Sequence, residues 1–241
     1  VVSGPVQPVL PVLGPAPRRP AGGGDVATAV WAGVWFSTVA AIVALAFGSD
    51  LDTTAYFAVL LPAQAMGELF VLLSLFRVKG SGDWRSDVGW GLRVRDAGWL
   101  FLGPALQILI ALVMVPILDA LDLVPSQGVT EEIQRAVSPL EAIAAFLAVA
   151  LIAPVSEEVF FRGILLRAQL RRFSERKALL LNAGVFAAVH LLDPGTWPLL
   201  PGLAFLGWVL AYLTVRSGTV SRAIFVHAGY NTLAVLLNLS A

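Results

Sequence analysis

An all-α membrane protein is the fold class that three features of this sequence predict. Hydrophobic residues make up 58% of its 241 residues and charged residues 13%, whereas an average soluble domain has about 45–50% and about 25%. The mean hydropathy is +0.82. Several apolar stretches approach the roughly 20 residues with which a helix crosses a bilayer. We therefore expect a polytopic bundle of transmembrane helices, with lipid as part of its solvent.

Seven apolar stretches are candidate spans. Pro and Gly crowd residues 1–25 too densely for regular structure, which predicts a flexible tail followed by a single transmembrane domain over 26–241. Pro194, Pro198 and Pro201 crowd the turn between the fifth and sixth spans, so a re-entrant segment is the alternative at that turn. The predicted number of spans is therefore about seven, within a range of six to eight. The expected spans are 26–48, 54–77, 98–121, 139–162, 177–193, 197–215 and 219–239.

The basic residues alternate between successive loops, and this alternation predicts the orientation. Loops rich in Lys and Arg face the cytoplasm in membrane proteins. Arg18 and Arg19 in the tail, five bases in residues 77–95 and five in residues 167–177 alternate with loops that hold one base or none. The pattern predicts a cytoplasmic N-terminus.

Composition also limits the chemistry. The net charge is zero, with 16 basic and 16 acidic residues, so no basic excess points to a nucleic-acid partner. The absence of cysteine excludes disulfides, thiolate metal ligands and cysteine nucleophiles. Only His190 and His227 can supply imidazole chemistry.

The fourth predicted span ends in SEEVFFRG, which places two adjacent carboxylates near the membrane. Glu158 and Arg162 are four residues apart and share a helix face, in the order that favours an ion pair. Glu157 is rotated by about 100° from Glu158, so we expect it to be free to face a cavity. The alternative is that all three side chains lie among lipid headgroups.

The two histidines occur in similar patterns on the fifth and seventh spans. Phe186 and His190 lie four residues apart, as do His227 and Asn231. A lone histidine in an apolar helix is usually a core residue, but here both lie within predicted spans. Their expected depths and that of Glu157 differ by about 10 Å at a rise of 1.5 Å per residue. Helix tilt or a kink at Pro154 must absorb this difference.

These side chains suit hydrolysis of an amide. A carboxylate and a histidine can deprotonate water, while a second histidine and an amide can donate hydrogen bonds to an oxyanion. Two histidines and one carboxylate can equally hold zinc. If zinc is bound, its ligands would be Glu157, His190 and His227.

Residues 139–235 contain three motifs in order, Glu-Glu-x-x-x-Arg, Phe-x-x-x-His and His-x-x-x-Asn. In this order the chain resembles the CPBP family of CAAX proteases and bacteriocin-processing proteins, also called the abortive-infection family, which is related to the type II CAAX prenyl endopeptidases. The resemblance implies an intramembrane endopeptidase whose site opens toward the cytoplasm.

The resemblance also implies roles. Glu157 would be the general base with His190 assisting, and His227 with Asn231 would form the oxyanion hole. Glu158 and Arg162 would hold the site together, with Phe186 packed beside it. The family has been described as metalloproteases, but a glutamate mechanism without metal is the interpretation we favour, with zinc as the alternative cofactor.

The expected substrates are membrane-anchored or prenylated proteins or peptides, in contact with membrane lipid. A composition rich in Ala, Val, Leu, Arg and Gly but poor in Lys indicates a GC-rich bacterial genome. The expected location is therefore the bacterial cytoplasmic membrane. Two other functions stay open, namely a non-enzymatic immunity or scaffold protein and a proton-coupled transporter. The transporter would require inverted repeats, and none is visible.

Three further polar positions lie in predicted spans. Gln64 and Glu68 share a face of the second span, where they either line the same cavity or bond to a neighbouring helix. Asn182 is expected to bond between helices.

Overall fold

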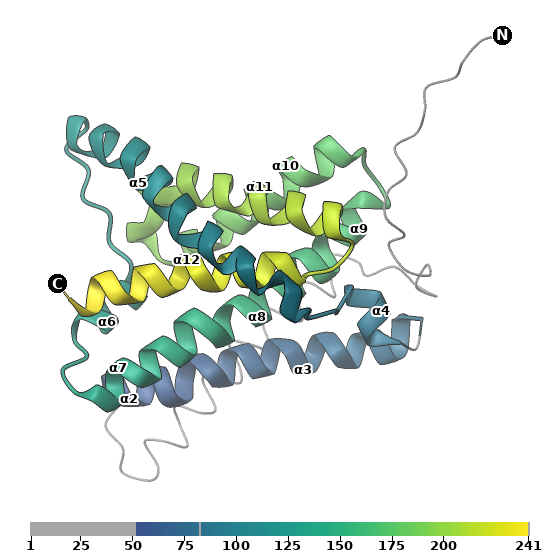
Figure 1. Ribbon diagram of the computed structural model, residues 1–241, viewed down its shortest axis with the longest axis horizontal. Coiled ribbons are helices and arrows are strands. Elements are labelled where there is room, and N and C mark those ends of the chain that lie inside the picture. The colour runs from purple at the N-terminus through teal and green to yellow at the C-terminus, as the bar shows by residue number, and fades with distance from the viewer. Residues whose placement is uncertain (1–51, 82, 241) are drawn as a thin grey trace.

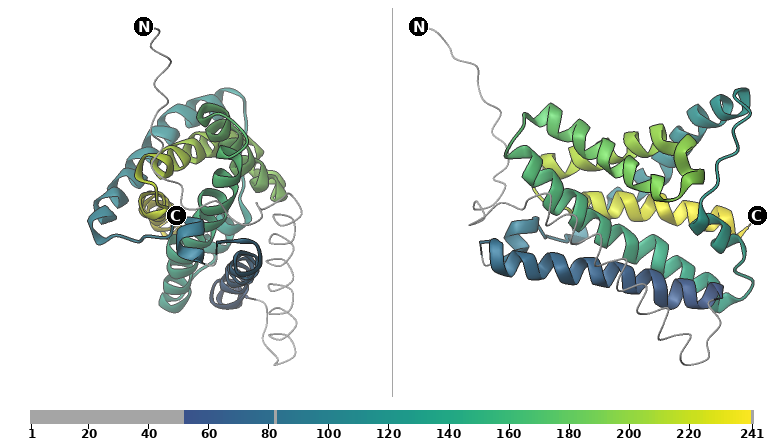
Figure 2. Two further views of the ribbon diagram at one scale, coloured as in Figure 1. Left: turned by 90° about the vertical axis from the view of Figure 1, so that its right-hand side faces the viewer. Right: turned by 180° about the vertical axis from the view of Figure 1, so that it is seen from behind.

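The computed structural model describes residues 52–81 and 83–240. Every regular element within these two ranges is a helix, which confirms the all-α class for the described part of the chain. The long helices run side by side (Figures 1 and 2). The C-terminal helix, α12 (Ser221–Leu239), lies between the pair α10 and α11 and the pair α3 and α8. The predicted tail 1–25 and the predicted span 26–48 lie outside the described residues.

The first described helix is a single rod made of α2 (Thr53–Ala55), the π-helical segment η1 (Tyr56–Leu60) and α3 (Leu61–Lys79). Asp52 begins it, because its carboxylate accepts a hydrogen bond from the backbone N–H of Ala55 at 2.9 Å. A side-chain acceptor at this position satisfies a donor that the first helical turn leaves free.

The next segment contains one long apolar helix. It consists of the short α4 (Trp84–Val88), the 3-10 segment η2 (Val94–Phe101) and α5 (Leu102–Ala120). In the most apolar stretch of Val94–Ala120, only 17% of the residues are buried within the protein. The exposed side chains of this helix are mostly aliphatic, so it presents a surface suited to lipid. A short helix, α6 (Gly128–Gln134), follows.

One continuous helix then carries the first motif. Its elements are α7 (Pro139–Ala145), η3 (Phe146–Ile152), α8 (Ala153–Glu158), η4 (Val159–Leu165) and α9 (Leu166–Leu170). Ser138 and Glu141 form a reciprocal capping box at its beginning. Both η3 and η4 are π-helical, so wider turns flank α8 on either side. Such turns inside α-helices frequently mark functional positions.

The remaining helices complete the bundle. They are α10 (Glu175–Val189), the 3-10 segments η5 (His190–Leu192) and η6 (Pro194–Leu199), α11 (Leu200–Ser217) and α12 (Ser221–Leu239). Helix α10 packs against α11, and α3 packs against α8. Helix α12 lies between these pairs and contacts α5, η2, η3, α8 and α11 (Figure 1).

Two glycines allow α12 to cross its neighbours closely. A Cβ atom added to Gly229 would collide with the backbone of η2, and one added to Gly103 would collide with the backbone of α12. The absence of both side chains lets the two backbones touch. This close contact fixes α12, which carries the third motif, against η2 and the beginning of α5.

Within residues 52–81 and 83–240, four helices are long and apolar enough to cross a membrane, namely Thr53–Ser74, Val94–Ala120, Pro139–Leu170 and Gly195–Ser217. They correspond to four of the seven predicted spans. The predicted spans 177–193 and 219–239 are helices but do not meet this criterion, since α10 has only 15 residues and α12 carries several polar side chains. The count of seven and the cytoplasmic N-terminus stay predictions.

Candidate active site

Two neighbouring carboxylates on α8 point in different directions. The side chain of Glu158 is 0% exposed, whereas that of Glu157 is 29% exposed. The rotation of about 100° between adjacent helical residues is the cause. The sequence prediction that the two carboxylates have different surroundings is therefore correct.

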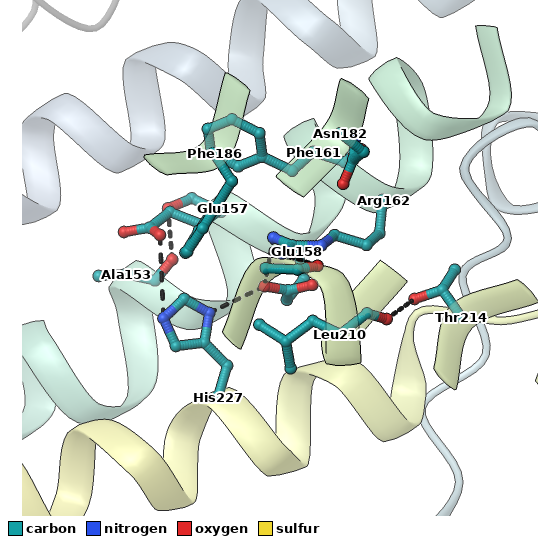
Figure 3. Close-up of polar contacts among 12 residues, drawn as sticks. Ala153, Glu157, Glu158, Phe161, Arg162, Asn182, Phe186, Leu210, Thr214 and His227 are labelled. Atoms are coloured by element: carbon teal, nitrogen blue, oxygen red, sulfur yellow. Dashed lines mark hydrogen bonds and ion pairs between the residues drawn. The ribbon is translucent and has the colours of Figure 1, made fainter. Parts of the chain in front are cut away.

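Glu158 is the centre of a buried network, which we define as Glu158, Arg162, His227 and the carbonyl of Gly207. Arg162 donates to Glu158 Oε1 at 3.0 Å and to the Gly207 carbonyl at 3.1 Å. The Nδ1 atom of His227 lies 2.8 Å from the same carboxylate oxygen. Three helices, α8–η4, α11 and α12, are thereby tied at one point (Figure 3).

This network also orients His227. An ionised carboxylate only accepts hydrogen bonds, so with Glu158 paired to Arg162 the hydrogen lies on Nδ1 of His227. The other ring nitrogen, Nε2, then points toward Glu157 Oε2 at 3.9 Å. Figure 3 shows His227 between the two glutamates. The histidine is only 4% exposed, so contacts within the protein, and not solvent, determine the orientation of its ring.

Phe186 packs the network against the second histidine. Its ring lies 4.4 Å below the guanidinium of Arg162, and its centroid is 5.1 Å from that of His190 and 5.9 Å from that of His227. Phe186 is 1% exposed. A desolvated cation over an aromatic face is stabilised by about 2 kcal/mol. The structure thus places Phe186 beside the site, as expected from the motif.

Asparagine amides hold both π-helical turns that flank α8. Asn231 Nδ2 donates to the carbonyl of Val149 in η3 at 2.8 Å, and Asn182 Nδ2 donates to the carbonyl of Phe161 in η4 at 2.9 Å. In η3 the backbone bonds skip five residues, as from Ala153 to Ala148. The next donor in that series would be residue 154, a proline without an N–H.

Asn231 therefore replaces a hydrogen bond that Pro154 cannot make. This observation gives the amide a structural partner within the helix that carries Glu157. Asn182 bonds α10 to η4 and so confirms the expected role between helices, although its acceptor, the Phe161 carbonyl, also receives the backbone N–H of Leu166. The predicted place of Asn231 in an oxyanion hole stays a prediction, because its Nδ2 atom already has an acceptor and the residue does not line the cavity described next.

Glu157 lines a cavity of about 280 Å³. The walls come from three elements of the bundle, namely α3, the helix η3–α8–η4, and the end of α10 with η5. The polar lining residues are Gln64, Glu68, Ser156, Glu157 and His190. The Ser156 hydroxyl donates to the carbonyl of Ala153 at 3.0 Å, which leaves Glu68, Glu157 and His190 as the lining groups able to transfer a proton.

His190 lies at the end of α10, not in the middle of a span as the sequence suggested. The 3-10 segment η5 begins at this residue, because Pro194 and Gly195 follow and the helix does not continue. Its Nδ1 atom lies 2.8 Å from the carbonyl of Phe186. Since a carbonyl only accepts, Nδ1 carries the hydrogen and Nε2 is left as an acceptor for water.

The structure brings most predicted site residues together. Glu157 and His190 share the cavity, and His227 contacts Glu157 from the buried side. The expected difference in depth of about 10 Å does not separate Glu157 from His190, because both line one cavity. For Gln64 and Glu68 the sequence left two alternatives, and the structure places both in the cavity wall.

Zinc stays an alternative cofactor, and its three expected ligands can be compared with the described side chains. No three His, Asp or Glu residues in 52–81 and 83–240 are arranged to hold a metal ion. The alternative ligand set Glu157, His190 and His227 is therefore not assembled in this structure. Nδ1 of His227 is bonded to Glu158 and Nδ1 of His190 to the Phe186 carbonyl, which leaves both Nε2 atoms available, as in histidines that bind a metal.

Fold and site define a class of protein, namely a helical membrane protein with a carboxylate and a histidine in an internal cavity. Residues 139–233 match the family model described as type II CAAX prenyl endopeptidase Rce1-like, which is a protease family. The match confirms the resemblance that the three motifs indicated and covers all of them. No curated protein and no solved structure gives a significant match to the chain.

Proposed function

We propose that this protein is an intramembrane endopeptidase that cleaves membrane-associated proteins or peptides with a glutamate-activated water. The observation that carries the proposal is the shared cavity of Glu157 and His190. Glu157 is partly exposed there and, among the described residues, forms no ion pair with Lys or Arg. The family match over residues 139–233 supports peptidase activity in general.

In the proposed reaction a water molecule lies between Glu157 and Nε2 of His190. Glu157 takes a proton as the water oxygen attacks the carbonyl carbon of the scissile bond. The resulting oxyanion receives hydrogen bonds from His227, whose Nε2 is a donor in the imidazolium form, and from Asn231 after its amide turns from Val149. Glu157 then passes its proton to the leaving amine as the C–N bond breaks.

The proposed substrates are anchored in the membrane, either by a span or by a prenyl group. A cavity within the bundle can receive only chains that already lie in or on the bilayer. We propose the bacterial cytoplasmic membrane as the location, with the site open to the cytoplasmic side. Processing of bacteriocin precursors and prenylated CAAX proteins are two forms of the same reaction.

The test compares purified wild type with Glu157→Gln on a library of membrane-anchored peptides, with cleavage read by mass spectrometry. Glu131→Gln is the matched control, because Glu131 lies on α6 with an exposed side chain. We expect cleavage by wild type and the control, with loss in Glu157→Gln. Cleavage equal in all three would remove Glu157 from the mechanism.

A strong chelator separates the two types of protease. Cleavage that persists under chelation supports glutamate-activated water, and cleavage that chelation abolishes supports the zinc alternative. A scaffold or immunity protein would bind peptides equally with Glu157→Gln and cleave none. A proton-coupled transporter would instead show substrate uptake into proteoliposomes that depends on a pH gradient.

A further inference from the structure

Helix α3 gives the cavity a second acidic wall. Four residues of α3 line it, at positions 61, 64, 65 and 68. This spacing of three, four and seven residues is a single helix face. Because α3 packs against α8, this face and Glu157 border the same space. Glu68 is the charged residue of this wall, and the proposed reaction does not use it.

The charge of the cavity is not balanced by its own lining. Two carboxylates, Glu68 and Glu157, line it, whereas none of the lining residues that the structure describes is Lys or Arg. Within residues 52–81 and 83–240 neither carboxylate has an ion pair with Lys or Arg. The expected span 26–48 contains no Lys, Arg or His in its sequence. Glu158, by contrast, is paired with Arg162.

Gln64 holds Glu68 on this face. Its amide nitrogen, Nε2, donates a hydrogen bond to Glu68 Oε1, one helical turn away, at 3.4 Å. The bond is with a neutral group, so it orients the carboxylate without neutralising it. Two carboxylates bordering one partly dry space repel each other, and a cation placed between them is stabilised.

We propose that Glu68 is a specificity-determining residue that selects substrate segments carrying a cationic side chain, Lys or Arg, close to the bond that is cleaved. A substrate cation enters the space between Glu68 and Glu157 and supplies the charge that the lining lacks. A substrate with Asp or Glu at that position would meet both carboxylates and bind poorly. The inference rests on the proposed function for the place of the cleaved bond, while its binding test does not.

The binding test uses single-span peptides with reduced, uncleavable backbone bonds. Lys, Gln or Glu is placed in turn at each position of the segment that reaches the cavity, and affinity for wild type is measured in nanodiscs. At one position or at adjacent positions we expect Lys to bind at least about tenfold tighter than Glu, since a partly desolvated charge pair is strong.

Variants assign the preference to Glu68. Glu68→Gln is expected to reduce the Lys-to-Glu ratio about fivefold or more, whereas Glu68→Asp keeps the charge and most of the preference. Glu131→Gln is the control for a carboxylate lost elsewhere. Absence of a Lys preference in wild type at every position, or a ratio unchanged by Glu68→Gln, overturns the proposal.

Cleavage measured in parallel separates the two proposals. If wild type cleaves and Glu68→Gln alters the Lys-to-Glu ratio through KM more than through kcat, both proposals are supported. If wild type cleaves but the ratio in Glu68→Gln equals that of wild type, the specificity proposal fails alone. If nothing is cleaved but the Lys preference depends on Glu68, the endopeptidase proposal fails and the cation-selective cavity remains.

Discussion

Glu157 and Glu158 are neighbours in the chain but belong to two unlike regions of the molecule. Glu158 lies in the buried network, where Arg162 and His227 both bond to one of its oxygens. Glu157 borders the cavity and contacts His227 only at 3.9 Å. A buried side chain in a network that bonds to two neighbouring helices stabilises the fold, whereas one that borders a cavity can act on a substrate. The predictions below test this division.

The largest expected effect follows from breaking the buried pair. Arg162→Met or Glu158→Gln alone leaves one buried charge without its partner, which costs about 3–5 kcal/mol of unfolding free energy. The double variant removes both charges and should recover much of the loss. Unfolding in mixed detergent micelles measures all three proteins. Losses that simply add in the double variant would mean that the pair does not act as a unit.

Phe186→Leu tests the contact between the two regions. It removes the ring below Arg162 at 4.4 Å while keeping an apolar side chain of similar size, so we expect a loss of about 2 kcal/mol. Because the ring also contacts His190 and His227, cleavage should fall by more than the stability loss explains. The same unfolding assay and a peptide-cleavage assay at low temperature provide the comparison.

Asn231→Ala tests the link between α12 and the π-helical turn before Glu157. The loss of one buried hydrogen bond to Val149 is expected to cost about 1 kcal/mol. Asn182→Ala, which removes the side-chain donor to the Phe161 carbonyl and leaves its backbone bond from Leu166, is the comparison variant at the other turn. If Asn231 serves only the fold, both variants lower cleavage equally. A much larger loss of kcat in Asn231→Ala would support its place in the oxyanion hole.

The smallest effect on stability is expected for Glu157→Gln. A partly exposed side chain without an ion pair to Lys or Arg in the described part of the chain should change the unfolding free energy by no more than about 0.5 kcal/mol. The same substitution at Glu158 should be severe. Equal destabilisation by the two substitutions, measured in one assay, would contradict the division between buried network and cavity.

Local spacing predicted those parts of the site that one helix determines. The pairing of Glu158 with Arg162, and the different direction of Glu157, follow from residues per turn. The contact of Phe186 with His190 has the same origin. Four apolar spans could likewise be predicted, because length and hydropathy are properties of each segment alone.

Contacts between helices could not be predicted in the same way. No sequence pattern shows that His227 lies between two glutamates, or that Gln64 and Glu68 turn toward the cavity, because both depend on how α12 and α3 are packed. The π-helical turns were missed as well. Pro154 was a signal for one of them, since its missing N–H requires a change in backbone bonding nearby.

Arg162 is anchored on α11 through the backbone carbonyl of Gly207, an atom that every amino acid possesses. A Cβ at position 207 would approach the Phe186 ring to 2.9 Å, so packing limits the residue there while the bond itself is indifferent to its identity. Alanine scanning of α11 would therefore leave this acceptor in place at every position. Side-chain substitutions on α11 therefore do not remove this hydrogen bond. Only a change in the main chain, for example an ester in place of the amide, would test it.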